Sequence, residues 1–205
     1  MLNRFTQHGM TIVELMIGIA VFATLLALAA PSFTEFIQNT QIRTSADGVM
    51  SGIQLAKTEA LRRNTSVRFQ LTDSLENGCV LSSAGNSWVV SLDDPTSACD
   101  VAPSAVNAPR IVQAKSGSEG AANARVVASG GAGGNNTVIF TGLGRLLATN
   151  ANSFSVVDIT NPTGGGCQHV ASTGTMRCLR IQVTTGGDGR MCDPKVTVAT
   201  DPRFC

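Results

Sequence analysis

The fold is decided by the stretch GMTIVELMIGIAVFATLLALAAPSFT, residues 9–34. From Met10 to Thr34 there are 25 residues whose only charge is Glu14. Because about 20 apolar residues suffice for a helix to cross a bilayer, this segment can span a membrane. The basic residue Arg4 precedes it and favours a cytoplasmic start of the chain, with everything after Pro31 on the other side.

A second interpretation of the same stretch is an ordinary secretory signal. Ala27-Leu28-Ala29 fits the small-residue pattern of a signal-peptidase site, and cleavage there would leave a soluble protein that starts at Ala30. Two residues weigh against it: Glu14 would interrupt a normally uncharged h-region, and Pro31 would stand second after the cut. We therefore favour a retained membrane helix.

Glu14 is the most informative residue of the segment. A carboxylate at membrane depth costs on the order of 2–3 kcal/mol and usually has a partner. Cleavage after Gly9 would create an amino terminus at Met10, and the same group on an adjacent subunit could offset the charge of Glu14. The alternative is that Glu14 lies near the interface, where the dipole of the helix N-terminus favours it.

The run Gly9-Met10-Thr11-Ile12-Val13-Glu14-Leu15, followed by the apolar stretch and Pro31, resembles the class III signal of type IV pilins and type II secretion pseudopilins. The resemblance implies that a prepilin peptidase cuts after Gly9 and that Met10 is then methylated. It implies that Glu14 assists docking into a growing filament and that Pro31 kinks the helix, since a Pro in a helix interior removes one hydrogen bond. It also implies partners, namely other minor and major pilins and an inner-membrane assembly platform.

An apolar stripe continues the helix beyond Pro31. Its members recur at spacings of three and four residues along one helical face: Ile42, Ala46, Val49, Ile53, Ala56 and Ala60. The pattern ends at Asn64-Thr65-Ser66, so the helix is predicted over residues 10–63. Half of the stripe is Ala and it lasts under four heptads, which favours packing on a sheet over a coiled-coil seam.

The remainder of the chain predicts an antiparallel sheet. Runs with period-two alternation or β-branched residues occupy 66–71, 88–92, 110–114, 125–128, 137–141, 154–159, 179–185 and 196–198. The expected architecture is α+β, a type IV pilin fold with a long N-terminal helix packed on a disulfide-stabilised β head. Its parts are a leader (1–9), a transmembrane or filament-core helix (10–34), an amphipathic half-helix (35–65) and a β-rich periplasmic head (66–205).

Six cysteines follow the export signal, which favours disulfides and an oxidising compartment. They are Cys79, Cys99, Cys167, Cys178, Cys192 and Cys205, and fifteen pairings are open to them. Proximity in the sequence favours pairing 79 with 99, 167 with 178 and 192 with 205, which closes three loops worth about 3 kcal/mol each. No C-x-x-C spacing occurs, so structural zinc is not expected.

Nothing in the sequence points to an enzyme, a metal site or a cofactor. His169 is the only His after the leader, and no Gly-x-Ser-x-Gly is present. Residues 73–109 carry a formal charge of −5 but lack EF-hand spacing, so we interpret them as a solvated acidic loop rather than a Ca²⁺ site. The net charge of +1 with 14% charged residues excludes a nucleic-acid-coating protein and an acidic disordered one.

Within the pilin family the layout resembles the FimT/FimU minor pilins and their GspH relatives. The shared features are the helix ending at residues 57–63, Gly144-Arg145 after a strand, and Gly189-Arg190 near the C-terminus. Some FimT relatives bind DNA through a C-terminal Gly-Arg-x-Arg motif. Here Cys192 replaces the second Arg and Asp193 follows it, which removes one phosphate contact and adds a repulsive charge.

The sequence therefore predicts a non-catalytic minor pilin, a structural and assembly subunit of the priming or tip complex of a type IV pilus. It would pass once through the inner membrane, with a periplasmic head, and later reach the pilus at the cell surface. Two alternatives stay open. One is a DNA-binding minor pilin with Arg190, Arg180 and Lys195 as candidate contacts, and the other is a type II secretion pseudopilin.

Overall fold

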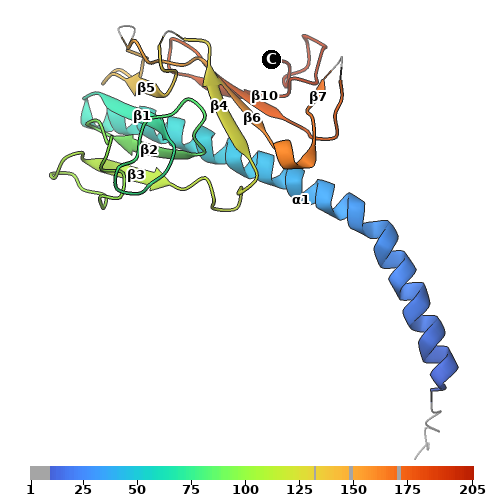
Figure 1. Ribbon diagram of the computed structural model, residues 1–205. Helices are drawn as coiled ribbons and strands as arrows, with labels where there is room; N and C mark the ends of the chain where they lie inside the picture. The colour runs from blue at the N-terminus through green and yellow to red at the C-terminus, as the bar shows by residue number, and fades with distance from the viewer. Residues whose placement is uncertain (1–9, 132, 148–149, 170–171) are drawn as a thin grey trace, which may run out of the picture. The chain divides into compact units, whose positions relative to one another are not determined.

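The computed structural model describes residues 10–131, 133–147, 150–169 and 172–205, and the side chains of all of these except 31, 169, 172 and 173. The chain divides into two compact units, residues 1–36 and 37–205. A single helix, α1 (Ile12–Arg63), begins in the first unit and ends in the second (Figure 1). The helix predicted over residues 10–63 is therefore confirmed to within two residues at its start.

The C-terminal end of α1 lies where the sequence predicts it. Asn64 adopts a left-handed conformation with φ 48°, which Asn tolerates better than most residues. Its N–H donates to Leu61 O at 3.3 Å, and the Thr65 N–H donates to Ala60 O at 3.3 Å. These two bonds form a Schellman cap, which satisfies carbonyls that the end of a helix leaves unpaired.

The strands of the second unit form two four-stranded antiparallel sheets and a short ribbon. The first sheet has the order β3-β2-β1-β5 and the second β10-β9-β6-β4, while β7 pairs with β8. The first sheet consists of β1 (Val67–Thr72), β2 (Ser87–Ser91), β3 (Ile111–Lys115) and β5 (Thr137–Phe140). The second consists of β4 (Arg125–Ser129), β6 (Val156–Thr160), β9 (Leu179–Val183) and β10 (Gly189–Cys192). The ribbon is β7 (Gln168–His169) with β8 (Ser172–Thr173), after the 3₁₀ turn η1 (Pro162–Gly164).

One strand prediction is wrong, the strands β7, β8 and β10 were not predicted, and the single predicted sheet becomes two. Residues 196–198 form no strand; they follow a turn closed by the Val196 N–H on Asp193 O. Residues 189–192 were not predicted as a strand and contain no β-branched residue, yet β10 pairs along its length with β9. The expected single sheet is divided because β5 pairs with β1 whereas β6, its neighbour in sequence, pairs with β4 and β9.

Both sheets share one hydrophobic core with the second half of α1. The six stripe residues are 0–1% exposed, and Phe69, Trp88, Phe140 and Phe154 from the strands and loops are buried with them. The Phe69 ring lies 5.7 Å from that of Trp88 and 6.2 Å from that of Phe154. A Cβ at Gly52 would stand 2.7 Å from the Phe69 ring, so this glycine lets the rings approach the helix backbone. The stripe therefore packs on sheets, as predicted.

Three disulfides close loops of the second unit, and they are the sequential pairs. Cys79 is bonded to Cys99, Cys167 to Cys178 and Cys192 to Cys205, with Cα–Cα distances of 6.1, 5.4 and 5.2 Å. The first pair is itself buried, in a small cluster with Val89 and Ile111 on the face of the first sheet that points away from α1. This disulfide thereby fastens the acidic stretch 73–109 to that face.

Candidate functional site

The described residues of the first unit form an apolar, exposed part of α1. The large apolar side chains described between Met10 and Phe36 are 50–81% exposed. By length and composition α1 is able to cross a membrane, and none of its most apolar 18-residue window is buried. Water is a poor solvent for such a surface, so a lipid or protein environment must cover it.

Glu14 lies in the first turn of this helix, where the structure gives it a local role that the sequence analysis missed. Thr11 precedes the helix, and its Oγ1 accepts a hydrogen bond from the Glu14 backbone N–H at 3.2 Å. The Thr11 carbonyl also accepts from the Leu15 N–H at 3.2 Å. Thr11 is thus the N-cap and Glu14 stands at the N3 position, the spacing of a capping box. The pattern Thr-x-x-Glu before an apolar run is a signal that could have predicted this cap.

The other residues of the predicted processing signal are only partly described. Gly9 lies outside the described residues. Met10 is 73% exposed and directly precedes Thr11, so its amino group would lie at the helix start after cleavage at Gly9. The backbone of Pro31 lies within α1, and the kink at this residue stays a prediction.

The segment Lys57–Arg63 forms the end of α1, where Glu59 binds two arginines of the same helix and Lys57 binds the turn between β9 and β10. Glu59 accepts hydrogen bonds from Arg62 Nη2 at 2.7 Å and Arg63 Nε at 2.6 Å. These two guanidinium groups, Arg62 first, hold the pKa of the Glu59 carboxyl below its ordinary value. Lys57 Nζ donates to Asp188 Oδ1, in the turn between β9 and β10, at 2.7 Å. This pair therefore stabilises the contact between α1 and the second sheet.

The glycines of the two Gly-Arg sequences, Gly144-Arg145 and Gly189-Arg190, lie against α1. A Cβ at Gly144, where φ is +73°, would meet Leu61 at 3.1 Å, and one at Gly189 would meet Met50 Sδ at 3.0 Å. A Cβ at Gly187 would collide with the Gly144 carbonyl oxygen at 2.1 Å, so the two turns touch each other beside the helix end. These glycines serve packing, and the arginine that follows each of Gly144 and Gly189 is exposed.

The three candidate DNA contacts do not form an unopposed basic surface. Arg180 is bound to Asp158 through two hydrogen bonds, of 2.7 and 3.1 Å. Arg190 donates to Gln182 Oε1 at 3.0 Å, across the β9–β10 register. Lys195 Nζ donates to Gln168 Oε1 at 2.8 Å. Of the three, only Arg190 and Lys195 keep a positive charge without a carboxylate partner among the described residues.

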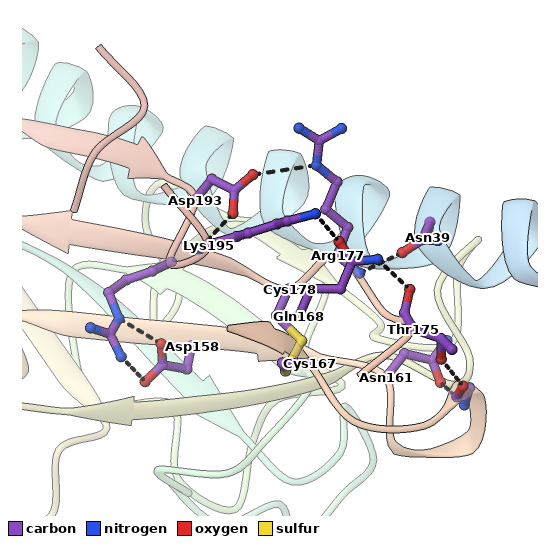
Figure 2. The surroundings of a disulfide bond; sticks show 12 residues. Asn39, Asp158, Asn161, Cys167, Gln168, Thr175, Arg177, Cys178, Asp193 and Lys195 are labelled. Carbon is purple, nitrogen blue, oxygen red and sulfur yellow. Dashed lines mark hydrogen bonds and ion pairs between the residues drawn. A yellow bond between two sulfur atoms is a disulfide. The ribbon is translucent and has the colours of Figure 1, made fainter. Parts of the chain in front are cut away.

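A buried carboxylate that the sequence analysis treated as repulsive organises this part of the second unit (Figure 2). The Asp193 side chain is 6% exposed, and its Oδ2 accepts from Arg177 Nε at 3.3 Å. Its Oδ1 accepts from the Lys195 backbone N–H at 2.9 Å. This carboxylate therefore holds the segment with Arg177, which precedes β9, and the segment with Lys195, which follows β10. No feature of the sequence predicted that Asp193 would be buried.

Two asparagines fasten loops of the second unit to residues 38–41 of α1: Asn39 holds the segment that carries Arg177, and Asn161 holds the turn η1 (Figure 2). The Arg177 N–H donates to Asn39 Oδ1 at 2.7 Å. The fully buried Asn161 donates through Nδ2 to Gln38 O and Gln41 Oε1, each at 3.4 Å, and caps η1 by accepting from the Gly164 N–H. The bond between Cys167 and Cys178 closes the same segment.

The acidic stretch 73–109 is held by cations and backbone donors. Arg110 Nε donates to Asp93 Oδ2 at 2.7 Å, and this guanidinium keeps the pKa of Asp93 below its ordinary value. The Asp73 carboxylate accepts from the Val80 backbone N–H at 2.9 Å, which lowers its pKa in the same way. In the described part of the chain, no group of three or more His, Cys, Asp or Glu side chains could hold a metal ion.

Comparison with known families gives two matches. Residues 45–187 match the model described as type II transport protein GspH, and residues 4–30 match the prokaryotic N-terminal methylation motif. No curated protein and no solved structure matches the chain. The first model covers more than half of the chain, from within α1 to just before β10, and the second covers most of the apolar segment. The chain belongs, with its pilin-type fold, to the GspH/FimT-like minor pilins and pseudopilins of type IV pili and type II secretion systems.

Proposed function

We propose that this chain is a minor pilin that takes part in assembling a type IV pilus, in its priming or tip complex. A prepilin peptidase cuts after Gly9, Met10 is methylated, and residues 10–34 hold the subunit in the inner membrane with its head in the periplasm. The subunit then leaves the bilayer and joins other minor and major pilins on the assembly platform.

The observation that carries the proposal is the exposed apolar segment of residues 10–34, whose only charge is Glu14. Each large apolar side chain moved out of water contributes about 1.5–3 kcal/mol. Lipid tails and the helices of neighbouring subunits are equally apolar, so this helix can exchange one environment for the other. The charge of Glu14 is costly in both unless a cation meets it, and the amino group at Met10 of an adjacent subunit would supply that cation.

The second unit suits a structural role. Its side chains are engaged in internal contacts: three disulfides, the ion pairs at the end of α1 and the carboxylate of Asp193. Such a body withstands transfer from the periplasm to the cell surface, because loops closed by disulfides stay folded in an oxidising environment.

A type II secretion pseudopilin is the second candidate function, since the matching family model carries that description. Both candidates use the same N-terminal segment and differ in the filament that contains the subunit. DNA binding by Arg190, Arg180 and Lys195 gains less support, because the Asp158 carboxylate already occupies the Arg180 guanidinium.

The proposal is tested by substituting Glu14 in the host. We expect Glu14→Ala to reduce surface pili strongly while the chain is still cut and methylated, because the helix loses the charge that sets its position beside a neighbour. The matched control is Glu35→Ala, which removes the other carboxylate that the described chain carries between Met10 and Phe36. Normal piliation with Glu14→Ala would contradict the proposal. A loss of protein secretion with intact pili would assign the chain to the secretion system instead.

A further inference from the structure

We propose that the second unit binds a second copy of this chain, through a basic patch that receives the acidic stretch 73–109 of the neighbouring molecule. The basic patch consists of Leu61, Arg62, Leu143 and Arg145, all of them exposed. The inference goes beyond the function proposed above, because it assigns a partner to a surface of the second unit. It uses only residues of that unit and does not depend on the membrane segment.

The basic patch forms where the turn 141–145 packs against the end of α1. The Thr141 N–H donates to Arg145 O at 2.9 Å and closes this turn. A Cβ at Gly144 would lie 3.1 Å from the Leu61 side chain, so the turn touches the last turns of the helix. The leucine and the arginine that flank this glycine therefore lie beside the leucine and the arginine at the end of α1.

The apolar part of the patch is open to solvent. Leu61 is 49% exposed and Leu143 is 78% exposed. A single exposed leucine is ordinary, but these two come from adjacent elements at one place on the surface. A partner that removed both from water would be favoured by the hydrophobic effect.

Positive charge exceeds negative charge around the patch. The charged residues of the helix end and of the two turns that contact it are Lys57, Arg62, Arg63 and Arg145 against Glu59 and Asp188. Four cations against two carboxylates leave an excess of two positive charges. Arg145 makes no side-chain hydrogen bond or ion pair with the part of the chain that the structure describes. Arg62 gives Nε and Nη2 to Glu59, so its Nη1 is available to a further carboxylate.

The acidic stretch offers the complementary charges. Residues 73–109 contain five carboxylates and no Lys or Arg, and Arg110 binds one of these, Asp93. The disulfide between Cys79 and Cys99 joins the segment that follows Glu76 to the segment that precedes Asp100. Both of these carboxylates are exposed, and neither lies in an ion pair with another described residue.

The same part of the stretch also carries an exposed apolar side chain. Val80 follows the first cysteine of this disulfide and is 51% exposed. The backbone bridge between Asn77 and Ala98 holds the two segments together beside it. We call Glu76, Val80 and Asp100 the acidic corner. Since the disulfide orders the corner in advance, binding costs little conformational entropy.

The basic patch and the acidic corner are separate surfaces of one molecule. No ion pair joins the described residues 57–63 or Arg145 to the stretch 73–109 of the same chain. A contact between the patch of one copy and the corner of the next leaves one surface of each kind unused at the two ends. Such a head-to-tail contact can repeat, so it suits a subunit of a filament.

The direct test is carbodiimide cross-linking of the full-length chain in detergent, with nitrogen-15-labelled and unlabelled molecules mixed. Arg145→Lys keeps the charge and supplies an amine, which the reagent joins to a carboxylate in contact with it. We expect peptides that join position 145 to Glu76 or Asp100 and that pair a labelled with an unlabelled chain. Lys57 is the internal control, because it should link to Asp188 of its own chain.

Lys195 is the matched control for specificity, since it is another exposed amine outside both surfaces. An equal yield of links from Lys195 to the acidic corner would overturn the proposal. Links from position 145 that never mix the isotopes would overturn it too, as would their absence while Lys57 links to Asp188. A link in sheared pili from position 145 to a different pilin instead would reassign the patch to that subunit and overturn the second copy as its partner.

Charge reversal gives an independent measurement, the sedimentation of the full-length chain in detergent. Arg145→Glu and Glu76→Arg should each weaken self-association about fivefold or more, because like charges then face each other. The two substitutions in one chain should restore most of it, since the reversed pair attracts again. Arg190→Glu changes the charge equally on β10 and should leave association unchanged.

A double variant that associates no better than either single variant would overturn the contact between these two surfaces. An equal loss with Arg190→Glu would also overturn it, because net charge alone would then explain the effect. Neither result bears on cleavage after Gly9 or on piliation with Glu14→Ala, so the contact and the proposed function are tested separately.

Discussion

At the scale of single residues, the carboxylates of this protein act mainly as acceptors that fix a neighbouring segment. Glu59 binds Arg62 and Arg63 at the end of α1. Asp193 binds the Arg177 side chain, before β9, and the Lys195 backbone, after β10. The sequence places Glu59 correctly on the helix, since three and four residues separate it from Arg62 and Arg63. It could not predict Asp193, because burial of a carboxylate depends on segments that meet only in the folded chain.

The first prediction concerns Glu59. We expect Glu59→Gln to lower the free energy of unfolding by about 1 kcal/mol, because hydrogen bonds to charged groups contribute more than neutral ones and the side chain is 14% exposed. For a chain of this size that corresponds to a Tm about 2–4 °C lower in thermal unfolding. Asp47→Asn is the control, since its pair with Arg43 is longer and exposed, and its Tm should stay unchanged. A larger loss with Asp47→Asn than with Glu59→Gln would contradict this account.

The second prediction concerns the pH dependence of the pair between Asp201 and Arg203. The guanidinium donates to the carboxylate at 3.1 and 2.8 Å and lowers the pKa of Asp201 to about 2. Since the folded pKa is below the unfolded one, the stabilisation is complete above the ordinary Asp pKa and is lost as the pH falls toward 2. We expect an NMR titration of the Asp201 carboxyl to show this low midpoint and Arg203→Gln to raise it. An ordinary Asp midpoint in the unsubstituted chain would refute the pair.

At the scale of elements, the periodicity of the sequence predicts the helix well and the sheets less well. The stripe from Ile42 to Ala60 is a local pattern, so both its face and its end at Asn64 could be read from the sequence. Sheet pairing joins distant residues, and nothing local distinguishes β5 as a partner of β1 from β6 as a partner of β9. For the same reason β10 was missed: pairing with β9, not its own residue types, makes it a strand.

The third prediction tests whether the stripe packs on the sheets. Ile53 is 1% exposed in the shared core, so we expect Ile53→Ala to destabilise the second unit by about 2–5 kcal/mol through lost burial and a residual cavity. Thermal unfolding of the full chain in detergent should show a Tm lower by about 5–15 °C. The matched control is Gln54→Ala on the exposed face of the same helix turn, which should change little. Equal effects of the two substitutions would show that this face of α1 is not buried.

At the scale of the whole molecule, the chain joins an exposed apolar helix to a body fastened by disulfides. The resemblance of residues 9–15 to pilins predicted the apolar helix, and the six cysteines that follow an export signal predicted the disulfides. The contact between Arg177 and Asn39 could not be predicted in this way. The two residues are 138 positions apart, and only folding brings them together.

The central claim is that the chain is processed at Gly9 and becomes part of a pilus. Mass spectrometry of pili sheared from host cells tests it most directly, by searching for a peptide of this chain that starts at Met10 and carries an N-methyl group. The account predicts that this peptide is present in the pilus fraction. Methylated Met10 found only in the membrane fraction would favour the secretion pseudopilin, and a mature chain that begins at Ala30 would contradict the account.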